Sequence, residues 1–218
     1  MSEPSQIALP LSARRPGAQR IVVGAANAGA IDALQSPERW PFHVAVLTGP
    51  PRSGKSLLGR WAEARNATLE VIDDAERMDE TALFHCWNAV QQGGTRADTE
   101  GGGALLIIAN ADPEHGGWRI ALPDLASRIG GSLQLAIQPP DDAMAGELIL
   151  AHAEARGLLL AEGAADYLVP RTTRSFAALE ALVATIDRIS LERQQPATMS
   201  VWRAALEALH GPEQQRLL

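Results

Sequence analysis

A glycine-rich segment that contains the only lysine of the chain is the clearest chemical signal in the sequence. The segment GPPRSGKS fits the phosphate-binding pattern G-x-x-x-x-G-K-[ST], with Gly49, Gly54, Lys55 and Ser56 at the defining positions. Glycines let backbone N–H groups close around a phosphate, lysine adds a compact positive charge, and a serine hydroxyl is a ligand for Mg²⁺. The pattern predicts that ADP or ATP binds here with Mg²⁺, in contact with Gly49, Pro50, Pro51, Arg52, Ser53, Gly54, Lys55, Ser56 and Leu57.

The alternative, a chance glycine-rich turn, is disfavoured by the context of the segment and by the lysine. An apolar run precedes the segment and a helical pattern follows it, which is the order that a phosphate-binding loop requires. The chain has 19 Lys and Arg residues, and all but Lys55 are arginine. A planar guanidinium fits the centre of such a loop poorly, so this position is where a lysine is expected.

Two adjacent acids end a second apolar run, LEVIDD, at residues 69–74. Asp73 is expected to bind the Mg²⁺ shell directly or through water, and Asp74 to polarise an attacking water. The alternative for this pair is a solvated helix cap, a position where Asp is also favoured. Because Asp is shorter than the Glu usual at the second position, hydrolysis at this site is expected to be slow.

Apolar runs and helical periodicity divide the chain into a tail and two domains. A tail at 1–19 precedes an α/β domain at 20–138, and an all-helical domain follows at 139–218. Strands that alternate with helices predict a parallel sheet in the first domain. The predicted strands are 43–49, 68–74, 104–110 and 132–137, and the predicted helices are 54–65, 80–90, 141–156, 162–168, 173–194 and 199–210. Residues 21–35 begin with three aliphatic residues and then show helical spacing at Ala26, Ile31 and Leu34.

Composition and charge exclude several classes of protein. The 218 residues carry a net charge of −7, which argues against a protein that coats nucleic acid phosphates, and no direct, specific DNA binding is expected. A single cysteine, Cys86, excludes an internal disulfide framework and a multi-cysteine zinc site. The N-terminus shows no signal-peptide pattern and no apolar run is long enough to cross a membrane, so a cytoplasmic protein is expected.

The order of these features resembles the AAA+ ATPases, and finer motifs resemble the DnaA/Hda-related branch of that family. A phosphate-binding loop is followed by a helix, an acidic strand, a strand that ends in Asn110 and a helical lid. LPDLASRIG (122–130) resembles the box VII segment, RTTRSFAALEALVATID (171–187) the sensor 2 helix, and IVVGAANAGAIDAL (21–34) the stretch that packs on the base. The resemblance covers nearly the whole chain and implies a P-loop AAA+ sheet domain followed by a small helical lid.

The resemblance also implies roles for individual side chains. Asn110 is expected to be sensor 1 and to orient water near the γ-phosphate, the alternative being an ordinary residue at a strand end. Arg128 is expected to be an arginine finger that acts on a neighbour's nucleotide, with a surface salt bridge as the alternative. Arg174 is expected to be sensor 2, in competition with Arg171 on nearly the same helical face. Val23 is expected to contact the base.

The hexapeptide QIALPL at 6–11 resembles the sliding-clamp-binding motif of the same branch. Gln6 is expected to make polar contacts, while Leu9 and Leu11 enter an apolar pocket of the DNA polymerase III sliding clamp. Pro10 restricts its own φ and biases Leu9 towards an extended backbone, which lowers the ordering cost of binding. The alternative is an N-terminal strand or staple that packs on its own domain.

Two departures from the family pattern change what is expected. Only twelve residues separate Ser56 from Leu69, which leaves no room for strand 2 of the AAA+ order 5-1-4-3-2. Strand 2 lies at the sheet edge in that order, so a sheet of four core parallel strands is expected. DnaA continues into a helix-turn-helix DNA-binding domain, whereas this sequence stops about where the lid is complete, which argues against autonomous origin recognition.

The expected function is regulation of replication initiation, in which the chain binds the sliding clamp and stimulates ATP hydrolysis by DnaA through Arg128. Its own adenine nucleotide is expected to be mainly structural, with weak or partner-dependent hydrolysis, and a homo-oligomer is a further expectation. Two alternatives stay open. One is a stand-alone P-loop ATPase or kinase, and the other is a DnaA-like or helicase-loader ATPase that binds DNA.

Overall fold

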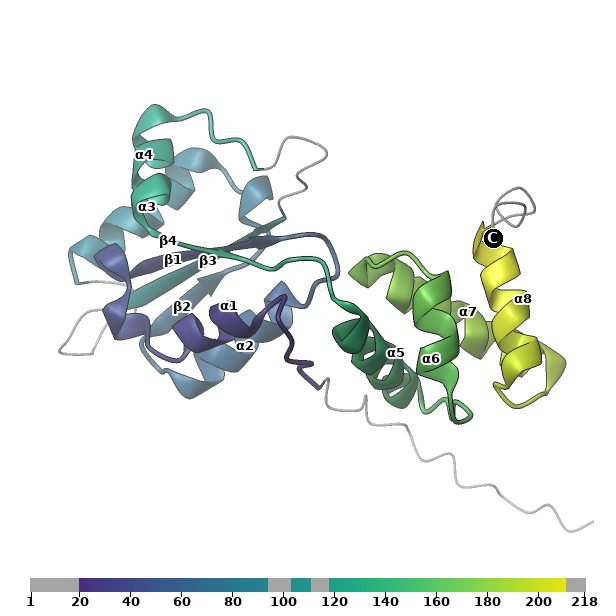
Figure 1. Cartoon of the computed structure of the whole chain (residues 1–218). Coiled ribbons are helices and arrows are strands. Elements are labelled where there is room, and N and C mark those ends of the chain that lie inside the picture. The colour runs from purple at the N-terminus through teal and green to yellow at the C-terminus, as the bar shows by residue number, and fades with distance from the viewer. Residues whose placement is uncertain (1–19, 94–102, 111–117, 211–218) are drawn as a thin grey trace, which may run out of the picture.

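Four parallel strands form the sheet of the first domain (Figure 1). The structure, a computed structural model, describes residues 20–93, 103–110 and 118–210. Within these ranges the strands lie in the order β2-β3-β1-β4 and every pair is parallel. The expected sheet of four parallel strands is confirmed; the strands are β1 (Val44–Gly49), β2 (Leu69–Ile72), β3 (Ala104–Asn110) and β4 (Leu133–Ala136).

The two central strands bring the start of the glycine-rich loop next to the end of β3. Both β1 and β3 are buried over almost their whole length, which explains why each reads as a continuous apolar run. Gly49 at the end of β1 is in register with Asn110 at the end of β3. Because β2 ends at Ile72, earlier than expected, Asp73 and Asp74 lie just beyond the same edge of the sheet.

Helices cover both faces of the sheet (Figure 1). α1 (Ala28–Leu34) and α2 (Lys55–Arg65) pack on the face that carries Leu47 and Ile108. α3 (Glu80–Gln91) and α4 (Pro123–Gly131) pack on the opposite face, which carries Val46 and Ile107. Side chains of one strand alternate between the two faces, so each strand supplies both cores. Short 3₁₀ helices connect these elements at η1 (Pro37–Arg39), η2 (Pro41–His43) and η3 (Ala75–Arg77).

The segment before α1 is not helical, and the helix expected from the spacing of Ala26, Ile31 and Leu34 begins only at Ala28. The buried Asn27 side chain holds this segment in a turn: its Nδ2 donates to the Val22 carbonyl oxygen at 2.8 Å, and its Oδ1 accepts from the Gly24 N–H at 2.9 Å. Asn side chains that bond nearby backbone groups compete with helix formation. The turn fixes the extended residues that precede it beside the sheet edge.

A glycine in α2 lets this helix lie close to the sheet. A Cβ atom at Gly59 would come within 2.7 Å of Ile108 Cδ1 and 3.0 Å of Val71 Cγ1, whereas a Cβ at Gly29 on the exposed face of α1 would meet nothing within 4 Å. Overpacking a core costs about 1–3 kcal/mol. We therefore expect Gly59→Val to lower the free energy of unfolding, measured with urea, by at least this amount. Gly29→Val is the matched control, and equal losses in the two variants would contradict the close approach of α2.

The chain passes from the sheet into a helical lid between Ala136 and Asp142. The lid has its own apolar core, to which α5, α7 and α8 contribute Ile149, Val183 and Val201. This confirms the expected helical lid. None of the helices in the described ranges is long and apolar enough to cross a membrane. The lid elements are α5 (Asp142–Arg156), α6 (Ala164–Leu168), η5 (Val169–Arg171), α7 (Phe176–Arg193) and α8 (Met199–His210).

The two arginines that compete for the sensor 2 role lie outside α7, so the expectation that they share a helical face is wrong. The Ser175 hydroxyl caps α7 by accepting a hydrogen bond from the Ala178 N–H at 3.2 Å. Arg174 therefore precedes the helix, while Arg171 ends η5. A Ser cap starts a helix at the residue that follows it, which explains why the helical pattern cannot extend back to Arg171.

Candidate functional site

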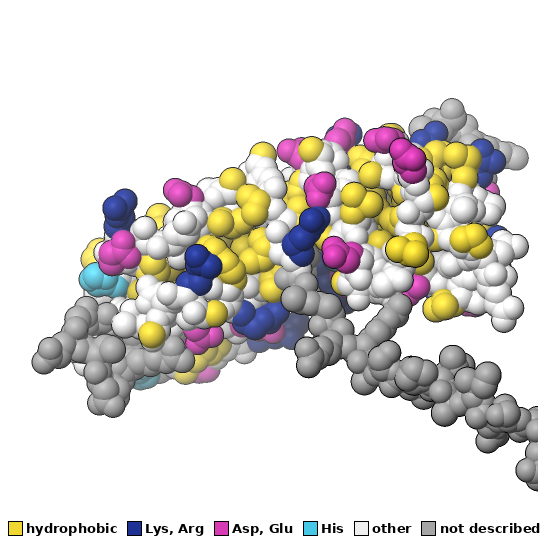
Figure 2. Space-filling model, turned by 90° about the horizontal axis from the view of Figure 1, so that it is seen from below, with side chains coloured by type: hydrophobic (Ala, Val, Ile, Leu, Met, Phe, Trp, Pro, Cys, Tyr) yellow, Lys and Arg dark blue, Asp and Glu magenta, His cyan; other side chains and the backbone are white. Residues whose placement is uncertain are grey.

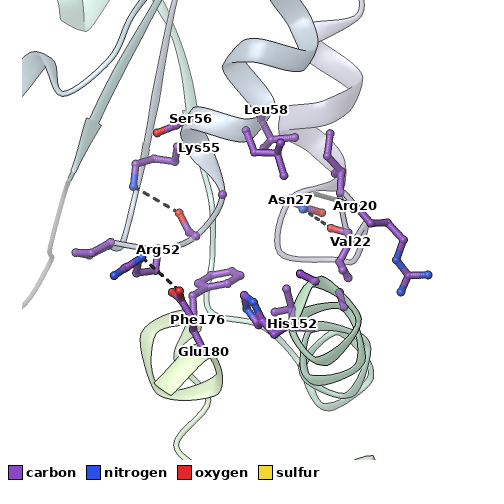
Figure 3. A pocket seen from close by; sticks show the side chains of 18 of the residues that line it. Arg20, Val22, Asn27, Arg52, Lys55, Ser56, Leu58, His152, Phe176 and Glu180 are labelled. Carbon is purple, nitrogen blue, oxygen red and sulfur yellow. Dashed lines mark hydrogen bonds and ion pairs between the residues drawn. The ribbon is translucent and has the colours of Figure 1, made fainter. Parts of the chain in front are cut away.

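A cavity of about 570 Å³ lies between the sheet edge and the lid (Figure 3). This volume is within the range of small-molecule and cofactor pockets. The sheet domain contributes the glycine-rich loop, the ends of β2 and β3 and the segment before α1, while α5 and α7 close the cavity from the lid side. The predicted residues that line it are Pro51, Arg52, Ser53, Gly54, Lys55, Ser56, Leu57, Asp73, Asp74 and Asn110.

The glycine-rich loop has the backbone form of an anion cradle. Gly54 lies in the left-handed region with φ of 85°, and the non-glycine residue Arg52 does so with φ of 66°. No side chain caps the N-terminus of α2, so the N–H groups of its first turn are not satisfied by a capping residue. Free N–H groups and the positive end of the helix dipole together favour a phosphate at this point. The loop therefore fits the phosphates of a nucleotide.

Lys55 lies inside the loop, with only 5% of its surface exposed. Its Nζ donates to the carbonyl oxygens of Gly49 at 2.9 Å and Pro50 at 2.8 Å, and to Oδ1 of Asn110 at 2.9 Å. Burial lowers the pKa of Lys55 below its usual value, and the carboxylates of Glu76, Asp73 and Asp74 oppose this shift only in part. The ammonium is thus desolvated beside the cradle, where a phosphate would satisfy it better than water does.

Glu76, which no motif in the sequence indicates, holds Asn110 in place. Its two carboxylate oxygens accept from the Asn110 side-chain Nδ2 at 2.6 Å and from the Asn110 backbone N–H at 3.0 Å. The Asn110 side chain thereby bridges Glu76 and Lys55. Asn110 is therefore a fixed polar group at the cavity rather than an ordinary strand end, and its Oδ1 faces the lysine.

The ionised form of Glu76 is expected to stabilise the fold. Burial alone would raise the pKa of Glu76, but the hydrogen bonds from Asn110 outweigh this effect and the net pKa is lowered. A lowered folded pKa means that the stabilisation is complete above the unfolded value of about 4.3 and is lost as the pH falls through the folded value. We expect Glu76→Gln to cost about 1–2 kcal/mol at pH 7, and the difference from the wild type to shrink as the pH falls below the unfolded value. Urea unfolding across this pH range measures it, and a constant difference would contradict the assignment.

Ser56 and the two acids form a set of oxygen donors at the same side of the cavity. Asp73 and Asp74 are exposed and line the cavity with Ser56. Hydroxyl and carboxylate oxygens are the donors that Mg²⁺ takes, usually with phosphate oxygens and water completing its shell. No group of three or more His, Cys, Asp or Glu side chains in the described ranges is arranged to hold a metal by itself. The donors fit Mg²⁺ that arrives with a nucleotide, with Ser56 and Asp73 as the residues that would hold it.

The end of the cavity next to the lid is mainly apolar and suits a base. It is lined by Ile21 and Val22 from the segment before α1 and by Phe176 from the start of α7. Val23, the residue expected here, is instead 63% exposed and does not line the cavity. The exposure of Val23 has a local reason. The Asn27 turn fixes the Val22 carbonyl, and successive residues of an extended segment point to opposite sides.

Three polar residues of the lid reach the cavity. Burial lowers the pKa of His152 on α5, with Arg156 acting in the same direction and Glu180 opposing it, so the imidazole is neutral at pH 7. Glu180 on α7 pairs with Arg52 of the loop at 3.3 Å and with Arg156 at 3.8 Å. Figure 3 shows the Arg52–Glu180 pair crossing from the loop to the lid. No spacing in the sequence indicates a role for these residues, since only the packing of the lid brings them to the loop.

Arg174 does not line the cavity. Its Nε pairs with Asp142 Oδ1 at 2.6 Å, and its side chain is 60% exposed. Arg171 is also outside the cavity, with its guanidinium 4.2 Å from the centre of the Tyr167 ring. In this structure the lid cation that lines the cavity is Arg156, so the sensor 2 role stays a prediction for Arg174.

Arg128 is separate from the cavity. It lies on α4, partly exposed, and its guanidinium carbon is 4.7 Å from the centre of the Phe84 ring and 4.6 Å from that of Trp87. Among the described residues it pairs with no carboxylate, so the salt bridge considered as its alternative is not formed within them. The predicted clamp-binding residues Gln6, Leu9, Pro10 and Leu11 lie outside the described residues.

Comparison with known proteins narrows the assignment. Residues 142–206 match the family described as Hda, lid domain. The structure is similar to domain III of the replication initiation protein DnaA from Thermotoga maritima, with a TM-score of 0.68 and 15% identity over 88% of this chain and 95% of that chain. It is also similar to the RuvB Holliday junction branch migration motor of Thermotoga maritima, with a TM-score of 0.62 and 14% identity over 86% of this chain and 70% of that chain.

A third similar structure is that of the replication initiator DnaA bound to AMPPCP and single-stranded DNA. Its TM-score is 0.56, with 17% identity over 80% of this chain and 66% of that chain. At these identities the likenesses show the fold alone, and the family match concerns the lid, residues 142–206. The lid, residues 142–206, is therefore related to the Hda family, and the chain as a whole has the fold of DnaA domain III, with a phosphate cradle on a four-stranded parallel sheet.

Proposed function

We propose that this protein promotes ATP hydrolysis by DnaA, acting through Arg128 while residues 6–11 hold it on the DNA polymerase III sliding clamp. The observation that carries the proposal is the position of Arg128 and its lack of a carboxylate partner among the described residues. Its guanidinium is fixed on α4 away from its own nucleotide cavity and has no carboxylate partner among the described residues. A positive charge held in this way can act on a phosphate that another protein brings. The match of the lid to the Hda family supports DnaA as that protein.

The chain's own adenine nucleotide has a mainly structural role in this proposal. Its cavity is built by the loop on one side and by α5 and α7 on the other, so a nucleotide that fills it would contact sheet and lid together. A ligand that binds both elements favours the arrangement in which both contact it. Asp74, rather than a longer Glu, is the residue expected to polarise water, so hydrolysis of this nucleotide is expected to be slow.

Direct DNA binding is not needed for this role, and the charge distribution does not favour it. On the face shown in Figure 2, the Lys and Arg side chains of the described residues are interspersed with Asp and Glu side chains. The net charge of the chain is −7, whereas proteins that bind DNA through its phosphates gather basic groups on one face. The alternative of a DNA-binding loader predicts tight, salt-dependent association with DNA in the absence of the clamp.

The proposal is tested by following the nucleotide of DnaA. DnaA loaded with radiolabelled ATP is mixed with this protein and with clamp loaded on DNA, and the fraction converted to ADP is measured over time. Conversion that needs both this protein and the clamp is the expected result. The double variant Gln6→Ala, Leu9→Ala tests the tether, and conversion that proceeds equally well with this variant or without the clamp would exclude clamp tethering.

A further inference from the structure

The packing of α3 against α4 gives Arg128 its position. α3 contacts α4 at both ends: the Glu80 carboxylate accepts from the Ala121 and Leu122 N–H groups at 2.8 and 2.6 Å, just before α4 begins. At the other end, Trp87 Nε1 donates to the Ser132 hydroxyl at 3.2 Å. The Trp87–Ser132 bond is buried and the Leu122–Glu80 bond is partly buried, whereas the Ala121–Glu80 bond is exposed. The turn of α4 that carries Arg128 is therefore held against α3 and has little freedom to shift along it.

The guanidinium of Arg128 stacks on two aromatic side chains of α3. Phe84 and Trp87 are three residues apart, so they occupy one face of α3. The Arg128 guanidinium carbon is within 4.7 Å of both ring centres. Phe42 packs on Trp87 with 5.8 Å between ring centres and supports this ring from a third element.

The same group of side chains also holds the backbone of Arg128. The Ser132 hydroxyl that accepts from Trp87 donates to the Arg128 carbonyl oxygen at 2.9 Å. Trp87 therefore contacts Arg128 in two ways, through the ring beneath the guanidinium and through Ser132 to the main chain. Both the guanidinium and the main chain of Arg128 are thereby held by contacts with α3.

Stacking restrains an arginine without neutralising it. A carboxylate partner would also order the side chain, but it would compete with any phosphate that the arginine has to reach. An aromatic face attracts the cation and leaves its N–H groups free at the edge of the guanidinium plane. The rotamer entropy of an arginine is large, so ordering it before a partner arrives removes part of the cost of binding in the productive geometry.

We infer that Phe84 and Trp87 are positioning residues that hold Arg128 ready for the phosphates of a partner's nucleotide. The inference rests on the proposed function, in which Arg128 acts in trans on a nucleoside triphosphate bound to DnaA. Loss of one ring leaves the charge but widens the range of positions that it samples. Loss of the arginine removes the charge itself, so the two kinds of variant differ in size of effect.

The first test measures the stimulated hydrolysis by DnaA at a saturating amount of this protein. Phe84→Leu is expected to lower this maximal rate about 3- to 10-fold, the range set by one cation–π contact, and to change the concentration for half-maximal stimulation much less. Trp87→Phe keeps a ring and is expected to retain most of the rate, whereas Trp87→Leu is not. The matched control is Trp61→Leu, which removes a stack of the same kind, 5.1 Å from Arg65, and is expected to leave the rate unchanged.

A second test needs no partner. Ring currents of Phe84 and Trp87 shift the Nε–H resonance of Arg128 in the full-length protein, and the signal is assigned by its loss in Arg128→Lys. In Phe84→Leu the resonance is expected to move towards the value of an exposed arginine, while Trp61→Leu leaves it in place. An unshifted resonance in the wild type would overturn the stacked geometry, whatever the activity of the variants.

The outcomes separate this inference from the proposed function. If Arg128→Ala stimulates DnaA as well as the wild type does, the proposed function is wrong. If Arg128→Ala is inactive but Phe84→Leu and Trp87→Leu, folded by their thermal unfolding, keep the full maximal rate, the proposed function stands and the positioning role is overturned. A rate as low in Trp87→Phe as in Trp87→Leu, together with a full rate in Phe84→Leu, would also overturn it, because the effect of Trp87 would then come from its hydrogen bond to Ser132 and not from the ring face.

Discussion

Replacing Lys55 by alanine is expected to weaken adenine nucleotide binding about 100-fold or more, since truncating one partner of a buried charge pair costs at least a few kcal/mol. The lysine is buried in the loop and hydrogen-bonded to two loop carbonyls and to Asn110. Its removal leaves the phosphates with backbone N–H donors but without the compact charge. Isothermal titration of the purified variant with ADP measures the loss.

The same variant separates ligand binding from folding. A ligand present at 100 times its Kd stabilises a protein by about 2.7 kcal/mol, so the wild type should unfold at a higher temperature when ADP is added. We expect the nucleotide-free variant to unfold cooperatively and to show no such shift at the same ADP concentration. Lys55→Arg is the charge-matched control and is expected to fail as well, because the planar group does not fit between the Gly49 and Pro50 carbonyls. Undiminished ADP binding by Lys55→Ala would exclude this cavity as the nucleotide site.

Arg128→Ala is expected to lower the stimulated hydrolysis by DnaA about 1,000-fold, the lower end of the range for arginine fingers supplied in trans. Because Arg128 does not line the chain's own cavity, the affinity of this protein for ADP is expected to stay unchanged. Titration with ADP is therefore expected to show a loss for the Lys55 variant and none for the Arg128 variant. Conversion of DnaA-bound ATP is the measurement that shows the loss in the Arg128 variant.

The control for this prediction is another arginine that lies on an aromatic ring. Arg65 stacks on Trp61 at 5.1 Å, on the opposite face of the sheet, and Arg65→Ala is expected to leave the stimulated rate unchanged. If Arg128→Ala reduces the rate by no more than about twofold, a value typical of a surface charge, then Arg128 is not the group that acts on the partner's nucleotide.

Local sequence patterns predicted the parts of the site that lie within one stretch of chain. The glycine-rich loop needs a fixed spacing over eight consecutive positions and a strand and helix on either side, and all of this is visible in the sequence. The sheet was also predictable, because buried parallel strands read as continuous apolar runs. Even the absence of strand 2 followed from the short segment between Ser56 and Leu69.

Contacts between distant segments were not predictable in the same way. Glu76 reaches Asn110 only because η3 turns the chain back under the end of β3. Periodicity predicted that α7 includes Arg174. The helix instead begins after its N-cap Ser175, so Arg174 lies before the helix and pairs with Asp142. The Arg128 stack likewise depends on the tertiary approach of α3 and α4, and single-residue spacing carries no information on it.

The Arg20–Glu147 pair, 2.7 Å long, joins the beginning of the first domain to α5. The distance between the hexapeptide and the lid is therefore limited by the length of chain before Arg20. The chain between Leu11 and Arg20 can extend to about 30 Å at most, at about 3.3–3.6 Å per residue. In the proposed function, a clamp that binds the hexapeptide would therefore keep the start of the first domain, and α5 with it, within about this distance. In the proposed function, a DnaA molecule would therefore have to come within this reach of the clamp-bound hexapeptide for Arg128 to act on its nucleotide.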